Sequence, residues 1–300
     1  MRYKLEKLGC YMLIIILLPY IVTVFINGPT VVSTTNVEET MVNVAAGEIQ
    51  GSMSLEDYGI GILAHEIPVD YEMEAMKTQA ILVRTRLYKN LQENGSDTVL
   101  KEEFWTREQM EEAWGLGTFT VNYNKFENAW HETKGQVLMY EDALAYTPFF
   151  HLSNGSTRDA KEVLGKEYPY LKIRECPLDI ESTEQIQTVT LENLNAKQTE
   201  IKILACDTAG YVLKVKVEDD EISGEEFRNN FGLASSCFSV QEYEGKIRIT
   251  TRGVGHGIGL SQYMANKMAE EGKTHQEILA YFFEGCEIKE VVDFVKSIES

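Results

Sequence analysis

Four segments of the sequence carry polar side chains in arrangements that suit chemistry. In the first, His65-Glu66-Ile67-Pro68, a carboxyl group lies between two expected helices, just before the positive end of the second helix dipole. The other segments run from Glu74 to Thr85, from His151 to Thr157 and from Gly253 to Tyr263. Taken singly, each has an ordinary explanation, since a glutamate before a proline is most often a solvated loop residue.

Glycines alternate with other residues in the fourth segment, from Gly253 to Gly259. The spacing fits neither the P-loop nor the dinucleotide fingerprint, and the P-loop lysine is missing. Alternate glycines leave one face of the backbone bare, which permits close approach by a bulky ligand. His256 lies in the middle of the run, so we expect it to be exposed. His151 and His256 have no local ligand pair, and we expect neither a metal ion nor another cofactor.

The charge of the chain excludes some partners. In 300 residues, 47 acidic side chains against 28 basic ones give a net charge of −19. Nucleic acid binding needs clustered Lys and Arg, so we expect no nucleic acid partner. Electrostatic adhesion to anionic lipid is excluded for the same reason, and any membrane attachment must be hydrophobic.

Such an attachment is predicted near the N-terminus. The stretch from Leu8 to Ile26 has no charged residue, and Arg2, Lys4 and Lys7 precede it. As a helix it spans about 28 Å, close to the thickness of the bilayer core. Basic residues before the span place the N-terminus inside and the remainder outside the cell membrane. We expect a single-pass anchor within residues 1–29 and a linker over 30–41; a cleaved signal peptide is the rival interpretation.

The rest of the chain predicts a single mixed α+β domain over residues 42–292, with a tail over 293–300. Strands and helices follow each other without regular alternation or internal repeat. We expect strands at Val42–Ile49, Val137–Tyr140 (paired with Tyr146–His151), within Gln187–Val217 and at Lys246–Thr251, and helices at Leu55–Ala64, Tyr71–Leu91, 102–114, Glu225–Phe231, Ser261–Glu271 and Thr274–Phe283. Cys176, Cys206, Cys237 and Cys286 either form two disulfides or remain buried thiols.

Together the four segments resemble the stage II sporulation protein D family in one order, over about residues 42–290. The family has an acidic residue before a hydrophobic residue and proline, then E-A-L-K-A-Q-A and A-R-T-Y. Here these are Glu66-Ile67-Pro68, Glu74 to Ala80 and Val83-Arg84-Thr85-Arg86. The family's G-H-G-V-G-M-S-Q-Y-G-A is present as Gly255 to Ala265, with Met264 replacing a glycine, and its serine-glycine segment as Ser153 to Thr157.

The resemblance implies a peptidoglycan lytic transglycosylase with a substrate groove. Such enzymes cleave denuded glycan strands between N-acetylmuramic acid and N-acetylglucosamine and leave a 1,6-anhydro end. One glutamate protonates the glycosidic oxygen and then acts as base toward the muramic acid 6-hydroxyl. We expect Glu66 in this role, with Glu74 as the alternative, because pairing with Lys77 or Arg84 would keep Glu74 ionised. Tyr58, Ile67 and Tyr71 are available as an apolar wall that raises the pKa of the acid.

The resemblance also implies binding residues and partners. Candidates for contact with the glycan are Ser153, Asn154, His256, Ser261, Gln262 and Tyr263. For Arg84 we expect a structural role, with contact to the lactyl carboxylate of muramic acid as the alternative. Met264 is expected to narrow the groove. Some clostridial relatives carry zinc, but this chain has no cysteine between residues 11 and 175, so zinc is not carried over. We expect a cell-wall amidase and a membrane scaffold protein of the engulfment machinery as partners in septal wall remodelling during sporulation. The alternative functions are a non-enzymatic amidase enhancer and a plain wall-binding module.

Overall fold

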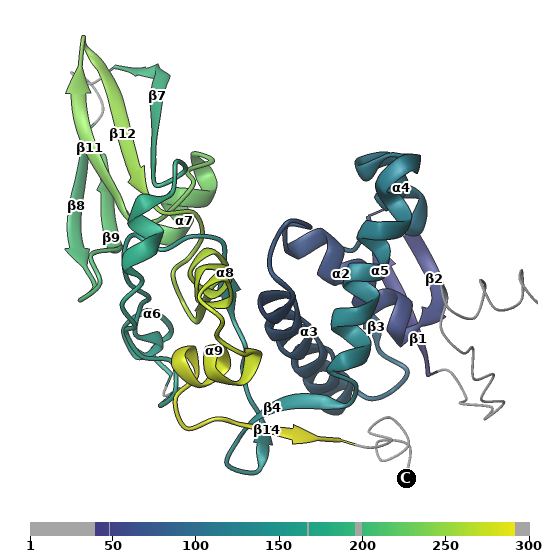
Figure 1. The fold of residues 1–300 in the computed structure, drawn as a ribbon. Coiled ribbons are helices and arrows are strands. Elements are labelled where there is room, and N and C mark those ends of the chain that lie inside the picture. The colour runs from purple at the N-terminus through teal and green to yellow at the C-terminus, as the bar shows by residue number, and fades with distance from the viewer. Residues whose placement is uncertain (1–39, 48, 167, 196–199, 292–300) are drawn as a thin grey trace, which may run out of the picture. The chain divides into compact units, whose positions relative to one another are not determined.

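A computed structural model of the chain describes residues 40–47, 49–166, 168–195 and 200–291 (Figure 1). The expected anchor within residues 1–29 and the expected tail over 293–300 lie outside these residues. Within the described ranges, no helix is both long enough and apolar enough to cross a membrane.

The N-terminal part combines a small sheet with four helices. Strand β1 pairs antiparallel with β2 and parallel with β3. The first helix begins at Ser54, whose side chain accepts a hydrogen bond from the backbone N–H of Asp57, which is the ordinary N-cap interaction. The elements are β1 (Met41–Ala46), β2 (Ile49–Ser54), α2 (Leu55–Glu66), α3 (Met73–Asn94), β3 (Val99–Leu100), α4 (Arg107–Trp114) and α5 (Leu116–Glu132).

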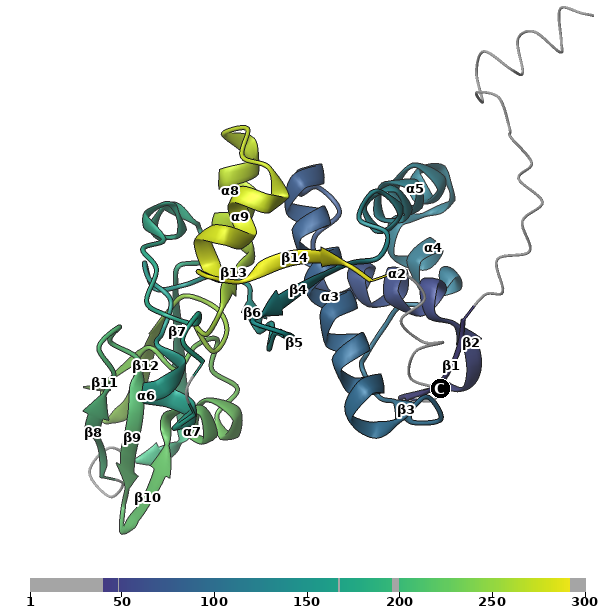
Figure 2. The same cartoon turned by 90° about the horizontal axis from the view of Figure 1, so that it is seen from below.

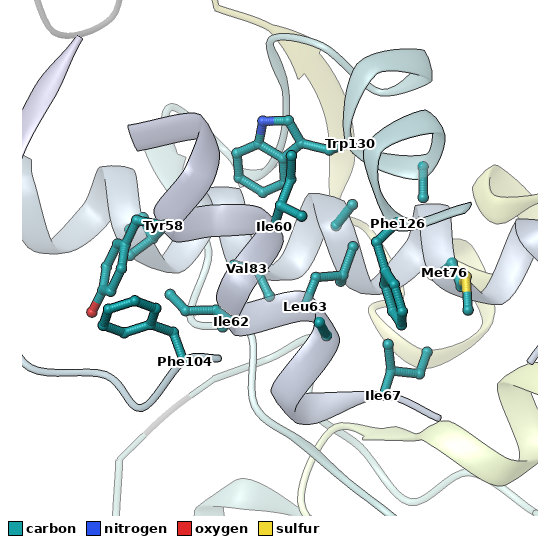
Figure 3. Close-up of a cluster of buried hydrophobic side chains, with 14 of the residues drawn as sticks. Tyr58, Ile60, Ile62, Leu63, Ile67, Met76, Val83, Phe104, Phe126 and Trp130 are labelled. Atoms are coloured by element: carbon teal, nitrogen blue, oxygen red, sulfur yellow. The ribbon is translucent and has the colours of Figure 1, made fainter. Parts of the chain in front are cut away.

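Helices α2, α3 and α5 enclose the first hydrophobic core (Figure 3). Tyr58, Leu63 and Phe126 are fully buried in it, and Trp130 is 6% exposed. Gly59 permits the close approach of α2 to α5, because a Cβ atom there would lie 2.2 Å from the Trp130 ring. These three helices therefore position the α2–α3 junction, which carries Glu66, on a tightly packed base.

The C-terminal part contains short sheets and the helices that cover the other side of α3. Strand β12 pairs with β7 and β11, β9 pairs with β8 and β10, and β6 pairs in parallel with β13. The elements are β4 (Gln136–Tyr140), β5 (Ala143–Leu144), β6 (Phe149–Phe150), α6 (Ala160–Leu164), the 3₁₀ helix η1 (Pro177–Glu181), β7 (Ile186–Asn195), β8 (Ile201–Cys206), β9 (Val212–Val217), β10 (Asp220–Ser223), α7 (Gly224–Asn230), β11 (Phe238–Tyr243), β12 (Lys246–Arg252), β13 (Leu260–Ser261), α8 (Gln262–Glu270), α9 (His275–Phe282) and β14 (Glu287–Glu290).

Helix α3 is shared by two cores. Its Ala80 and Val83 lie in the first core, whereas Ile81 and Leu82 pack into a second core with α8 and α9. A helix that is apolar all round is a buried helix, and α3 fits that rule over this stretch. A third core fills the space between the β7–β12–β11 sheet, the β8–β9–β10 sheet and α7.

The mixed α+β class is confirmed, and most of the expected elements are present. The expected pairing of Val137–Tyr140 with Tyr146–His151 is wrong. Strand β4 turns back at Glu141 (φ +54°) and pairs at once with β5, while its other edge pairs with β14 (Figure 2). Helix α5 was not expected, and the four cysteines of the described region are free thiols.

Candidate functional site

Glu66 is the last residue of α2, at the junction with α3. Its Oε1 accepts a hydrogen bond of 2.6 Å from Arg86 Nη2, and its Oε2 accepts one of 3.2 Å from Gln79 Nε2. Both donors lie on α3. The backbone carbonyl of Glu66 accepts a hydrogen bond of 2.9 Å from Gln262 Nε2, at the start of α8. Helix α3 thus holds the carboxyl group of Glu66, and α8 holds its backbone carbonyl.

Burial dominates the electrostatics of Glu66. The side chain is 17% exposed, and its removal from water raises the pKa of the carboxyl group. Arg86 acts in the opposite direction, but the negative charge of Glu102 adds to the increase. The net result is a pKa above the ordinary value for glutamate. A raised pKa favours the protonated form of the carboxyl group, which is the form that a general acid requires.

Arg86 links Glu66 to a second carboxylate and to aromatic rings. Its Nε and Nη2 lie 2.8 and 2.7 Å from Glu102 Oε2, and its guanidinium carbon lies 5.3 Å from the centre of the Phe149 ring. Arg86 also acts electrostatically on Tyr146, which is 36% exposed. Sequence reasoning did not assign a role to these residues, because their closeness to Glu66 depends on the tertiary fold.

Glu74 lies in a different environment from Glu66. Its Oε1 is 2.8 Å from Lys77 Nζ, and its Oε2 accepts hydrogen bonds from the backbone N–H of His275 (2.8 Å) and interacts with His275 Nδ1 (2.7 Å). Partial burial alone would raise the pKa of Glu74, but the hydrogen bonds from Lys77 and His275 outweigh it and lower the pKa to about 2. Glu74 is therefore ionised at neutral pH, which favours Glu66 as the proton donor.

Arg84 is buried in the helical core. It is 2% exposed, its guanidinium donates to the backbone carbonyls of Trp130, Thr133 and Gln136, and it stacks 4.0 Å from the centre of the Trp130 ring. Arg84 joins α3 to the end of α5. This position fits the structural role expected for Arg84 and does not fit the alternative, a contact with the glycan.

Two serines of the expected glycan-binding set hold a buried aspartate instead. Asp179 Oδ2 accepts hydrogen bonds from the backbone N–H of Ser153 (2.8 Å) and from Ser261 Oγ (2.7 Å). Both serines and Asp179 are fully buried. Gln262 is 3% exposed, and its amide reaches the carbonyl of Glu66. Ser153 and Ser261 therefore position Asp179, and Gln262 supports the backbone of Glu66, whereas Tyr263 is half-buried.

The glycine-rich segment packs against the protein itself. A Cβ atom at Gly259 would lie 2.0 Å from the Pro148 carbonyl, and one at Gly257 would lie 2.7 Å from the Tyr211 ring. Both residues have positive φ angles. His256 is half-buried rather than exposed, its Nδ1 accepts a hydrogen bond of 3.1 Å from the backbone N–H of Ile258, and burial lowers its pKa. The expectations of an exposed His256 and of a bare face for a ligand are therefore wrong.

Asn154 lies at a cavity of about 400 Å³, separate from the Glu66 cluster. Its side-chain amide donates to the carbonyl of Ala209, and the cavity is also lined by Gln185, whose buried Oε1 has no hydrogen-bond partner in the described structure. Met264 is 9% exposed and belongs to the second core, so it does not narrow a groove as expected. Among the described residues, no cluster of three or more His, Cys, Asp or Glu side chains is arranged to hold a metal ion.

Comparison with known proteins gives consistent matches. The family model described as "Stage II sporulation protein" matches residues 45–140. The chain is 31% identical to Stage II sporulation protein D of Bacillus amyloliquefaciens, over 81% of this chain and 76% of the relative. It is 30% identical to Stage II sporulation protein D of Bacillus subtilis, over 81% and 77%. It is also 23% identical to the amidase enhancer of Bacillus subtilis, over 75% of this chain and 39% of that protein.

Proposed function

The chain belongs to the stage II sporulation protein D family, a family of sporulation proteins, and from that premise we propose that it is a peptidoglycan lytic transglycosylase. The proposed reaction cleaves the bond between N-acetylmuramic acid and N-acetylglucosamine in denuded glycan strands. The observation that carries the proposal is the partly buried Glu66 carboxyl group, whose pKa is raised although Arg86 and Gln79 are hydrogen-bonded to it.

In the proposed mechanism one carboxyl group performs both proton transfers. Glu66 donates its proton to the glycosidic oxygen as the bond from that oxygen to C1 of the muramic acid breaks. The glutamate then accepts the proton of the 6-hydroxyl, whose oxygen attacks C1 and closes the 1,6-anhydro ring. No water is consumed, so the second carboxylate that glycoside hydrolases require is not needed. The Gln79 amide, which donates to Glu66 Oε2, stabilises the carboxylate between the two transfers.

The test is product analysis of the Glu66→Gln variant. Denuded glycan strands are incubated with wild type, with Glu66→Gln and with Glu74→Gln as the matched control, and anhydro products are quantified by mass spectrometry. We expect Glu66→Gln to lose about 10²- to 10⁴-fold in rate, because glutamine cannot transfer a proton. Glu74→Gln retains activity. If folded Glu66→Gln still forms anhydro ends at the wild-type rate, the proposed mechanism is refuted.

The similarity to an amidase enhancer supports a second candidate function. In this alternative the domain binds glycan and stimulates a separate wall amidase without cleaving the strand itself. A domain that increases amidase turnover but yields no anhydro ends would support this function over the first. Glu66→Gln separates the two further, since stimulation by binding does not require a proton donor.

For the location we propose a single-pass membrane protein whose domain lies outside the cytoplasm. The support is the uncharged stretch Leu8 to Ile26 with basic residues before it. In this setting a cell-wall amidase and a membrane scaffold protein of the engulfment machinery are the proposed partners. Protease accessibility of the domain in intact protoplasts tests the orientation: a domain protected from added protease would contradict it.

A further inference from the structure

Arg86 occupies an unusual position beside the candidate acid. The segment Val83-Arg84-Thr85-Arg86 ends in arginine where the family motif ends in tyrosine. Its guanidinium bridges Glu66 and Glu102, with Nη2 2.6 Å from Glu66 Oε1 and 2.7 Å from Glu102 Oε2. The bridge leaves capacity for another ligand: Nη1 donates to no acceptor in the described part of the chain, and the side chain is 29% exposed.

The surroundings of Arg86 suit a sugar that carries a negative charge. The Phe149 ring lies 5.3 Å from the guanidinium carbon, and the partly exposed Tyr146 pairs with Tyr168 at a ring separation of 5.1 Å. Aromatic faces pack against the apolar faces of sugar rings, and a planar guanidinium binds a carboxylate with two parallel hydrogen bonds. Lysine or tyrosine at this position would lack that paired geometry.

We propose that Arg86, Phe149 and Tyr146 form a subsite for a free carboxylate on the glycan, and that this carboxylate replaces Glu66 as a partner of Arg86. The chemical class is a lactyl ether carboxylate, as in muramic acid without a stem peptide. The inference rests on the proposed function and deepens it. In a strand that still carries its stem peptides, the lactyl carboxyl group is an uncharged amide. Such a strand cannot form the ion pair with Arg86, and we expect it to bind more weakly.

The exchange of partners at Arg86 also favours protonation of Glu66. With both carboxyl groups ionised, Glu66, Glu102 and Arg86 carry a net charge of −1, and an incoming carboxylate would make it −2. Tyr58 on α2 also interacts electrostatically with Glu66, but its hydroxyl donates to the backbone carbonyl of Glu102 and adds no positive charge. Once the Arg86 guanidinium pairs with the ligand instead, a partly buried Glu66 takes up a proton, and the net charge of the cluster returns to −1. Ligand binding is therefore coupled to the uptake of one proton by Glu66.

The first experiment measures selectivity. Denuded strands and the same strands with their lactyl carboxylates converted to carboxamides are compared as substrates and, with the inactive Glu66→Gln variant, as ligands. We expect wild type to prefer the carboxylate strand about 10- to 100-fold in kcat/KM, in line with a charge-assisted paired contact. Arg86→Gln brings the ratio close to one. The matched control is Arg107→Gln, which removes another arginine paired with a carboxylate, Asp57, and keeps the wild-type ratio.

The second experiment measures the proton. Binding of a non-cleavable muramic acid disaccharide is followed by calorimetry in buffers of different ionisation heat. Wild type is expected to take up about one proton when it binds the disaccharide, and none when it binds the carboxamide analogue of that disaccharide. If Arg86→Gln does not fold, Arg86→Lys keeps the charge without the paired geometry, and its preference falls below the wild-type value.

The outcomes separate this inference from the proposed function. Equal binding of carboxylate and carboxamide strands, or a preference that persists in folded Arg86→Gln, overturns the subsite while cleavage by Glu66 stands. Loss of selectivity in Arg86→Gln supports the subsite. If wild type forms no anhydro ends at all, the proposed function fails, and the binding ratio of Glu66→Gln still decides whether Arg86 recognises the carboxylate.

Discussion

Replacing Glu74 by glutamine is expected to destabilise the protein while leaving the proposed cleavage intact. In the folded protein Lys77 and the N-terminus of α9, at His275, surround the Glu74 carboxylate with hydrogen-bond donors. Glutamine keeps one acceptor oxygen but places an N–H₂ group against one set of these donors. The substitution therefore removes the charge and one of its charge-assisted hydrogen bonds.

The magnitude follows from the pKa of Glu74. A folded-state pKa of about 2 against an ordinary 4.5 is a difference of about 2.5 pH units. At about 1.4 kcal/mol per unit this corresponds to about 3.5 kcal/mol. Because the side chain is 30% exposed, solvent screening reduces the expected cost to about 1–2 kcal/mol. A carboxylate with a lowered folded-state pKa stabilises the protein above pH 4.5, and this contribution is lost as the pH falls from about 4.5 to about 2.

The assay is urea denaturation of wild type and Glu74→Gln at pH 7 and at pH 3. We expect the gap in unfolding free energy to be present at pH 7 and to shrink at pH 3. Glu93→Gln is the matched control, since Glu93 forms an exposed pair with Lys89 in the same helix and its loss costs less than about 0.5 kcal/mol. The reasoning is refuted if Glu74→Gln is as stable as wild type at pH 7 but forms no anhydro ends, because Glu74 would then act in catalysis.

Two further predictions concern buried charges. The side chains of Arg158 and its partner Asp207 are each 1% exposed. Arg158→Met therefore leaves a buried carboxylate without its ion-pair partner and lowers the unfolding free energy by about 3–5 kcal/mol, as urea denaturation measures. The double variant Arg158→Met with Asp207→Leu recovers much of this loss. Glu66 has a raised folded-state pKa, so the folded state holds its proton to higher pH than the unfolded state, and wild-type stability falls as pH rises from about 4.5. Glu66→Gln is therefore more stable than wild type at pH 8 and equal to it near pH 4, as denaturation at both pH values checks.

The sequence predicted well the helices whose first turn is marked by an N-cap residue. Ser54 and Thr274 cap the helices α2 and α9 as expected, because an N-cap acts through residues two or three positions away. The partner of strand β4 depended on distant segments and was predicted wrongly, since β14 follows it by more than a hundred residues. Helix α5 was missed although Tyr123, Phe126 and Trp130 form an apolar stripe at helical spacing that could have revealed it.

The candidate site divides in the same way. Glu66 was accessible from its motif, because the residues that mark it are neighbours in sequence. Its environment was not, since Arg86 and Glu102 lie 20 and 36 positions further on. Arg86 meets Glu66 through the packing of α2 against α3, and Glu102 lies in the segment between β3 and α4, which contacts α2. The buried roles of Ser153 and Ser261 were also out of reach, because each depends on Asp179, which no motif singled out.

These buried contacts give the glycine-rich segment a structural purpose in the site. Its glycines let the chain pack against Pro148 and Tyr211, and this packing leads directly into α8. From α8, Gln262 donates to the carbonyl of Glu66, and the Asn266 side chain accepts the backbone N–H of Glu72. Both ends of the junction between α2 and α3 are therefore tied to one helix. In the proposed mechanism Glu66 must keep its position through both proton transfers, and the contacts of this segment would hold Glu66 in place rather than bind the sugar.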